Sequence, residues 1–184
     1  MTLEKILVEQ GAPTLARIKT GSLFKVDCGS AGQLAREAEH CRAILAPRDV
    51  HLELMRVTEG RALVYVYRGR RLEMDLACPL RREFLKGCGY EEFSARQAVS
   101  RLRQRIEETG GFPHEIGLFL GYPLRDVEGF VLNCGRNCLL CGPWKVYHDV
   151  QEAERRFAQL RKCTMIYRKL YGLGRSLDRL TVAA

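Results

Sequence analysis

Residues 50–68 read VHLELMRVTEGRALVYVYR, and this stretch predicts the centre of the fold. Its two outer runs, 50–57 and 62–68, are rich in β-branched and aromatic residues, which favour strands. The residues TEGR between them are a turn signal, so the stretch predicts a β-hairpin. Both runs carry apolar residues at consecutive positions, which predicts a sheet that is covered on both faces.

Helical patterns surround this hairpin. Residues 30–46 carry apolar side chains at helical spacing, with Ser30 as the expected N-cap and Pro47 just beyond the end. The same reasoning predicts further helices at residues 1–13, on either side of Pro79, at 94–109, at 124–132 and from Asp149 to about Gly172. Residues 115–122 and 144–148 predict two short strands. We therefore expect an α+β fold, with a small, mainly antiparallel sheet packed among several helices in a single domain over residues 1–184.

Length and composition indicate an ordinary globular protein. The chain has 184 residues, of which 46% are hydrophobic and 28% charged, and this length suits one domain with a proper core. No run approaches the roughly 18 consecutive apolar residues that a membrane span needs. The N-terminus lacks the apolar region of a secretory signal. We expect a cytoplasmic protein without a membrane partner.

The charge balance is basic, with 30 Lys and Arg against 22 Asp and Glu. Basic clusters occur at residues 68–71, 101–105 and 155–169. Such clusters can attract nucleic acid or an acidic protein. Because Glu residues are interleaved with them and no nucleic-acid motif accompanies them, we interpret them mainly as solvated helix faces. A basic interaction module is kept as a third hypothesis.

Three of the eight cysteines, Cys134, Cys138 and Cys141, form a CxxxCxxC motif. In a reducing compartment such cysteines serve as free thiols, metal ligands or catalytic groups. The spacing fits an iron–sulfur cluster. Zinc is the other option, with Cys138 and Cys141 as a CxxC hook and Cys134 or His148 completing the site. Radical S-adenosylmethionine enzymes share the spacing but carry it early in a large barrel, so we exclude them. Buried core cysteines and a reactive thiol pair are the alternatives.

Two further segments carry candidate site residues. Residues 112–123, FPHEIGLFLGYP, place His114 and Glu115 at the entrance of an apolar run, and burial alone gives no reason for a histidine and a carboxylate there. Residues 142–149, GPWKVYHD, offer Lys145 and Tyr147 on one face of a strand, where they could bind an anionic or aromatic ligand.

The sequence resembles an uncharacterised family of short bacterial proteins, largely from anaerobes, with PHE and LGYP as signature motifs. The resemblance rests on PHEIGLFLGYP, CGPWKVYHD and CTMIYRKL, and extends to APTLARIKTGSLF and EFLKGCGY. It implies that His114, Glu115 and the residues 121–123 lie in the signature and that residues 144–147 form a second recurrent block. The signature has no fixed CxxxCxxC, so a cluster would be particular to this chain or its subgroup.

Three functions follow as hypotheses. The first is a small redox-associated enzyme or ligand-binding protein, with a pocket where the PHE segment meets the WKVY strand and a small molecule or a redox protein as its partner. His114 would be the acid, base or ligand with Glu115 orienting it, while Tyr122, Lys145 and Tyr147 would bind the substrate. The second is an iron–sulfur or zinc module held by the three cysteines, and the third is the basic interaction module.

Overall fold

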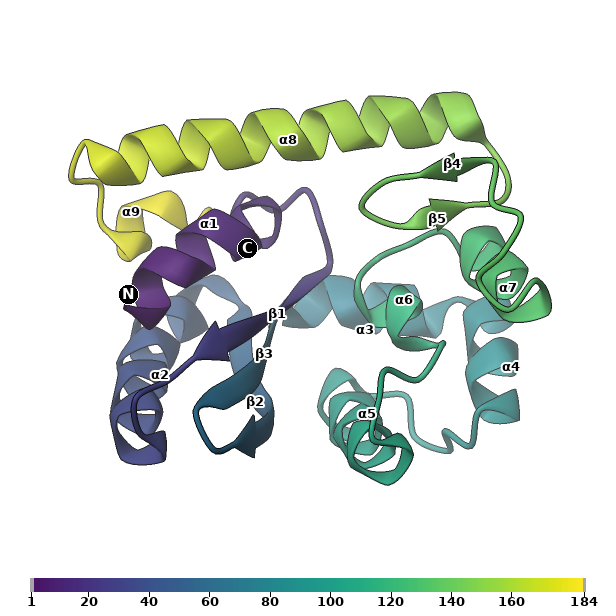
Figure 1. The fold of residues 1–184 in the computed structure, drawn as a ribbon, viewed down its shortest axis with the longest axis horizontal. Helices are drawn as coiled ribbons and strands as arrows, with labels where there is room; N and C mark the ends of the chain where they lie inside the picture. The colour runs from purple at the N-terminus through teal and green to yellow at the C-terminus, as the bar shows by residue number, and fades with distance from the viewer. Residues whose placement is uncertain (1, 184) are drawn as a thin grey trace. The chain divides into compact units, whose positions relative to one another are not determined.

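The computed structural model describes residues 2–183 and has the predicted α+β architecture (Figure 1). Its backbone contacts divide it into two compact units. We call residues up to 72 together with those from 163 onward the sheet unit, and residues 73–162 the helical unit. That both units form one domain stays a prediction.

The predicted hairpin is the centre of the sheet unit. Strands β2 (Val50–Thr58) and β3 (Arg61–Arg68) pair antiparallel, and β1 (Gly21–Asp27) pairs antiparallel with the other edge of β3. The order is therefore β1-β3-β2. Every residue of β3 after Arg61 is buried, so the predicted cover on both faces is confirmed for β3. It is wrong for β2, where His51, Val57 and Thr58 are exposed. The sequence analysis did not assign β1, although its Phe24 and Val26 point inward and alternate with exposed Lys25.

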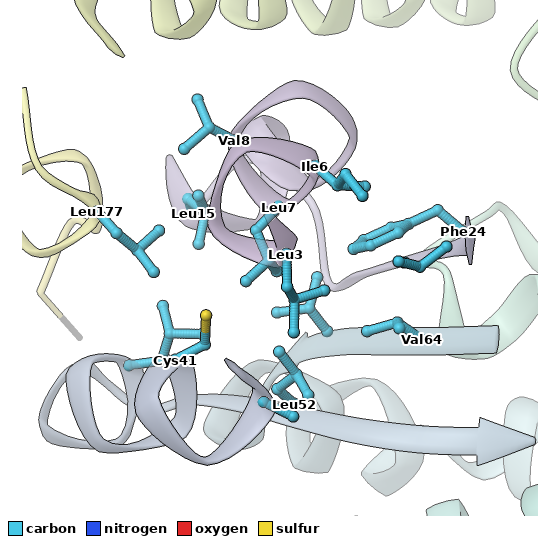
Figure 2. Close-up of a cluster of buried hydrophobic side chains, with 14 of the residues drawn as sticks. Leu3, Ile6, Leu7, Val8, Leu15, Phe24, Cys41, Leu52, Val64 and Leu177 are labelled. Carbon is cyan, nitrogen blue, oxygen red and sulfur yellow. The ribbon is translucent and has the colours of Figure 1, made fainter. Parts of the chain in front are cut away.

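Two helices bury the apolar face of this sheet. Helix α1 (Leu3–Leu15) and helix α2 (Ala31–Leu45) contribute Leu3, Leu7 and Cys41 to one cluster with Phe24 and Val64 of the strands (Figure 2). The short helix α9 (Leu177–Leu180) adds its two leucines to the same cluster. Burying each such leucine stabilises the fold by about 1.5–3 kcal/mol, so the cluster contributes strongly to the stability of the unit.

Arg68, at the end of β3, ties the sheet to α1. Its side chain is 1% exposed and donates hydrogen bonds to the carbonyl oxygens of Thr14, Leu15 and Arg48. The last carbonyls of a helix have no hydrogen-bond donor within the helix, and burial keeps water away from them. The Arg68 guanidinium supplies the missing N–H donors. Burial lowers the pKa of Arg68 from its ordinary value. The C-terminal segment reaches the same place, since the Val182 amide donates to the Leu15 carbonyl.

The helical unit contains most of the remaining elements. They are α3 (Gly69–Ala77), which begins in the sheet unit, α4 (Pro79–Gly87), α5 (Ala95–Thr109), α6 (Ile116–Phe119), α7 (Leu124–Leu132), β4 (Leu140–Cys141), β5 (Lys145–Val146) and the first part of α8 (Val150–Gly172). The predicted break at Pro79 and the predicted Ser30 cap are confirmed, since Ser30 accepts from the Gln33 amide. The structure adds a cap at Ser94, which accepts from the Gln97 amide.

Two predicted strands differ from the structure. Residues 116–119 form a short helix, because an apolar run of this length fits a buried helix as well as a buried strand and Gly121, at φ 75°, turns the chain after it. Of residues 144–148 only Lys145 and Val146 are strand, paired with Leu140 and Cys141. None of the helices in the described part of the chain is long and apolar enough to cross a membrane.

A carboxylate caps the start of α1 and gives a pH-dependent contribution to stability. Glu37 of α2 accepts a hydrogen bond from the Leu3 amide, with Leu3 N 2.7 Å from Glu37 Oε2, and this bond, followed by one from Gln33, lowers the pKa of Glu37. A carboxyl whose pKa is lowered by folding stabilises the protein above the ordinary glutamate range, and this contribution is lost as the pH falls through the folded pKa.

We predict that Glu37→Gln lowers the free energy of unfolding at pH 7 by about 1 kcal/mol, as for the loss of a helix cap. The difference from wild type should disappear at low pH, where Glu37 is protonated. Urea unfolding at neutral and acidic pH measures it, with the exposed Glu59→Gln as the control. An equal loss at both pH values would contradict this role.

Candidate functional site

A cavity of about 510 Å³ lies within the helical unit. Its walls come from the loop before α6, from α6 and α7, and from the turn between β4 and β5. The lining residues are Phe112, Pro113, His114, Ile116, Gly117, Tyr122, Asp126, Val127, Phe130, Cys141, Gly142, Pro143, Trp144 and Lys145. The volume is typical of small-molecule sites, and the mainly apolar and aromatic lining is also typical of them. We call this cavity the aromatic pocket.

Asp126, in the first turn of α7, joins two walls of the pocket. One carboxylate oxygen accepts the indole N–H of Trp144 at 2.8 Å, and the other accepts the backbone amides of Tyr147 at 2.8 Å and His148 at 3.1 Å. Asp126 is 5% exposed, so an unpaired carboxylate here would be costly, and three donors remove that cost. The β4–β5 hairpin is therefore held against α7 by one side chain.

Stacked rings form one wall of the pocket. Tyr122 and Trp144 are stacked with ring centroids 4.9 Å apart, and the other side of Trp144 meets the edge of Phe157 from α8 at 4.5 Å. The Tyr122 hydroxyl donates to the Pro143 carbonyl at 3.1 Å. Burial raises the pKa of Tyr122 to about 12, so the phenol stays protonated at neutral pH. The wall is therefore aromatic and closely packed.

Two glycines allow these elements to approach each other. A Cβ on Gly117 of α6 would lie 2.7 Å from a methyl group of Val127, and a Cβ on Gly142 would overlap the ring of Phe157. Real Cβ atoms do not come so close to other side chains, so α6 and the hairpin turn occupy these positions only because both residues lack a side chain.

The polar groups that remain available in the pocket are basic. The Lys145 ammonium donates to the Gly135 carbonyl, with Nζ to O at 2.6 Å, and lies 5.9 Å from the centre of the Phe130 ring. The same ring lies 5.4 Å from the exposed imidazole of His114. Because the carboxylate of Asp126 already accepts three N–H groups, the lysine and the histidine determine the charge that a ligand would meet.

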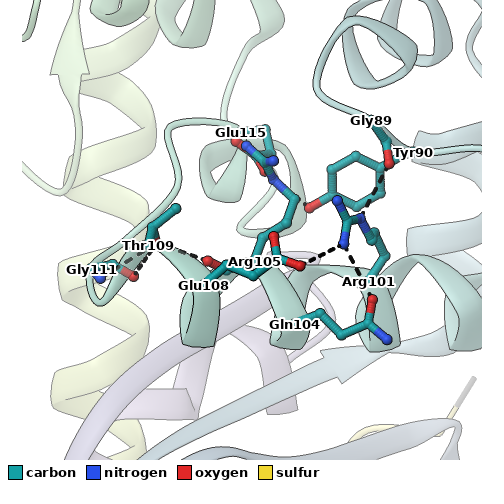
Figure 3. Close-up of polar contacts among 9 residues, drawn as sticks. All are labelled: Gly89, Tyr90, Arg101, Gln104, Arg105, Glu108, Thr109, Gly111 and Glu115. Carbon is teal, nitrogen blue, oxygen red and sulfur yellow. Dashed lines mark hydrogen bonds and ion pairs between the residues drawn. The ribbon is translucent and has the colours of Figure 1, made fainter.

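Glu115 does not line the pocket. Its side chain is 2% exposed, forms an ion pair with Arg105 of α5 and accepts from the Tyr90 hydroxyl at 3.2 Å (Figure 3). The pKa of Arg105 is raised, mainly by the hydrogen bond to Glu115, while burial, followed by the Glu115 charge, raises the pKa of Tyr90. These contacts are those of a buried link between α5 and the start of α6. The role of Glu115 in orienting His114 stays a prediction.

Tyr147 lies elsewhere as well. It packs against Gly129 of α7 and lines a separate hollow with His148, whose ring nitrogen Nε2 is 2.6 Å from Nη1 of Arg125. Thus the structure brings three of the five residues predicted as catalytic or ligand-binding, His114, Tyr122 and Lys145, to one pocket. Residues of the PHE segment and of the WKVY segment both line this pocket.

The three cysteines of the CxxxCxxC motif are free thiols. Cys134 and Cys141 are exposed and Cys138 is half-buried, and only Cys141 lines the pocket. Among residues 2–183, no three His, Cys, Asp or Glu side chains are gathered so that they could hold a metal ion. Cys141 pairs with Lys145 in the β4–β5 hairpin. The iron–sulfur or zinc module therefore stays a prediction that this arrangement does not support.

Sequence reasoning missed Asp126 and Phe130 as site residues. Both lie on α7, whose apolar pattern predicted a helix but not the side that faces the pocket. An aspartate in a first helical turn is a common feature, so nothing in the sequence distinguished Asp126. Its partner Trp144 is 18 residues away, and only the tertiary fold joins them.

Comparison with known proteins identifies a family and nothing further. A family model described as "Protein of unknown function (DUF3793)" matches residues 7–181. Neither the curated proteins nor the solved structures contain a match. The function must therefore be argued from the pocket itself.

The two signature residues should respond differently to mutation. We predict that Glu115→Gln lowers the free energy of unfolding by about 2 kcal/mol, because a neutral amide leaves the half-buried Arg105 charge unpaired. The melting temperature would fall by about 6 °C. His114→Gln, at an exposed position, should change it by less than about 2 °C. Calorimetry measures both, and equal melting temperatures would contradict the structural role of Glu115.

Asp126 should control the environment of Trp144. We predict that Asp126→Asn destabilises the protein by about 2 kcal/mol and shifts Trp144 fluorescence to longer wavelength. Asparagine replaces one accepting oxygen by an NH2 group, which cannot accept a hydrogen bond, so at least one of the three N–H donors loses its partner. Glu128→Gln, an exposed change on the same helix, is the control. Unchanged emission in Asp126→Asn would show that the hairpin does not depend on this carboxylate.

Proposed function

The chain belongs to the DUF3793 family, whose function is unknown, and we propose that it is a small-molecule-binding protein whose ligand occupies the aromatic pocket. The observation that carries this proposal is the pocket itself. It combines a ligand-sized volume, an aromatic and apolar lining and a few polar groups at defined positions, which is the usual composition of a small-molecule site.

The construction of the pocket supports the proposal. A buried carboxylate, a stacked pair of rings and two close-packed glycines hold its walls in place. A preformed cavity loses little conformational freedom when a ligand binds, which favours affinity. In contrast, a hydrophobic core that only needed stability would be filled, since packing an apolar void adds stability.

An enzymatic form of the proposal is supported by two reactive groups in the lining. The imidazole of His114 and the thiol of Cys141 both reach the pocket and are exposed. Imidazole can transfer protons near neutral pH, and a thiol can act as a nucleophile or redox group. We further propose a cytoplasmic location, where a reducing environment would keep all eight cysteines as thiols. A redox protein stays a proposed partner.

Trp144 allows a direct test, because it is the only tryptophan of the chain and lines the pocket. The probe is N-phenyl-1-naphthylamine, a neutral dye that fluoresces in apolar surroundings. We predict that it binds the wild-type protein with energy transfer from Trp144. Ile116→Phe, which places a larger side chain at the pocket wall, should weaken this binding about tenfold, equivalent to about 1.4 kcal/mol.

The matched control is Leu132→Phe, which makes a similar change at an exposed position of α7 outside the pocket lining. It should bind the dye as the wild type does. Equal binding by the wild type and Ile116→Phe, with both proteins folded by circular dichroism, would rule out the pocket as the dye's site. Absence of energy transfer in the wild type would do the same.

A further inference from the structure

We propose that the ligand of the aromatic pocket is a flat aromatic anion, whose carboxylate or phosphate group binds Lys145 and whose ring lies against the aromatic side chains of the lining. This inference rests on the proposed function, since it names the chemical class of the ligand for the same pocket. It is carried by the charge of the available polar groups and by the kind of apolar surface around them.

The charge follows from which groups are already satisfied. Asp126 is the only carboxylate among the described residues that line the pocket, and both of its oxygens accept N–H donors from the β4–β5 hairpin. Lys145, in contrast, has a single hydrogen bond to the neutral carbonyl of Gly135 within the described part of the chain. An ammonium group has three donors, so Lys145 retains donors for an incoming anion.

The surroundings of Lys145 favour an anion over a neutral ligand. Its ammonium is half-buried beside the Phe130 ring, and a charge with a reduced water shell gains more from an ionic partner than an exposed one does. The exposed imidazole of His114 contacts the same ring and can add an N–H donor. The whole chain carries a formal net charge of +8, which attracts anions toward the protein.

The flat shape follows from the rings that line the pocket. Trp144 and Tyr122 present a stacked pair, and Phe130 with His114 presents a second pair of rings in the same cavity. Aromatic side chains bind planar rings through offset stacking and edge contacts, which gives more than the burial of the same apolar area. A flexible aliphatic anion would meet the same charge without this gain.

The test compares four probes by isothermal titration calorimetry: 2-naphthoate, 2-naphthyl phosphate, neutral 2-naphthalenemethanol and the aliphatic anion octanoate. At least one naphthyl anion should bind the wild type ten or more times tighter than the alcohol and than octanoate. Lys145→Met should remove this preference over the alcohol and leave alcohol binding unchanged. Lys162→Met, an exposed lysine of α8 outside the pocket lining, should behave like the wild type.

A measurement on the wild-type protein tests the charge assignment even if Lys145→Met does not fold. Raising the salt concentration from about 50 mM to about 500 mM should weaken binding of the naphthyl anion and not that of the alcohol, because salt screens the ionic contact alone. Equal affinity for anion and alcohol, or an anion preference that survives in folded Lys145→Met, would overturn the charge assignment. Octanoate binding as tightly as the naphthyl anions would overturn the aromatic assignment.

These outcomes are separate from failure of the proposed function. If Ile116→Phe still weakens binding of the neutral dye while the anions show no preference, the pocket is a binding site for a different class of molecule. If Ile116→Phe changes neither the dye nor the naphthyl probes, then the pocket is not the site, and both proposals fall together.

Discussion

The candidate site depends on the hydrogen bonds that the buried carboxylate of Asp126 accepts. Asp126 is buried at the start of α7, and it accepts the indole N–H of Trp144 and two backbone amides at the end of the β4–β5 hairpin. A hairpin with only two residues in each strand has little stability of its own. The charged hydrogen bonds to Asp126 and the packing of Trp144 against Phe157 compensate for this weakness.

The same interaction determines what the pocket offers to a ligand. Asp126 accepts N–H donors of the hairpin, and these donors balance its negative charge. The basic side chains that remain in the pocket lining are Lys145 and His114. Glu115, adjacent to His114 in the sequence, is removed from the pocket by its ion pair with Arg105. Two carboxylates near the site thus serve its construction, and the basic groups stay available. This division of roles links the stability of the helical unit to the function proposed for it.

Much of the fold follows from local patterns in the sequence. The hairpin of β2 and β3 was predicted because β-branched and aromatic runs flank a turn signal, and α2, α5 and α8 because their apolar side chains recur at helical spacing. The helix at residues 116–119 was predicted as a strand, since four or five consecutive apolar residues carry no periodicity. Strand β1 was missed even though its alternation of Phe24 and Val26 with exposed residues is visible in the sequence.

For the site, the sequence by itself determined the candidates but not their partners. It indicated His114 because burial alone does not explain a histidine at the entrance of an apolar run, and Lys145 because of its place on the expected strand. Tyr122 entered through the signature that the resemblance implies, and these three line one pocket. Only the tertiary structure decided that Glu115 turns to Arg105, that Tyr147 lines a different hollow, and that Asp126 holds Trp144. Neighbours in the sequence can face opposite sides of an element, and the partner of a buried charge comes from a distant segment. Local spacing therefore indicates candidate side chains, while long-range packing decides which of them meet.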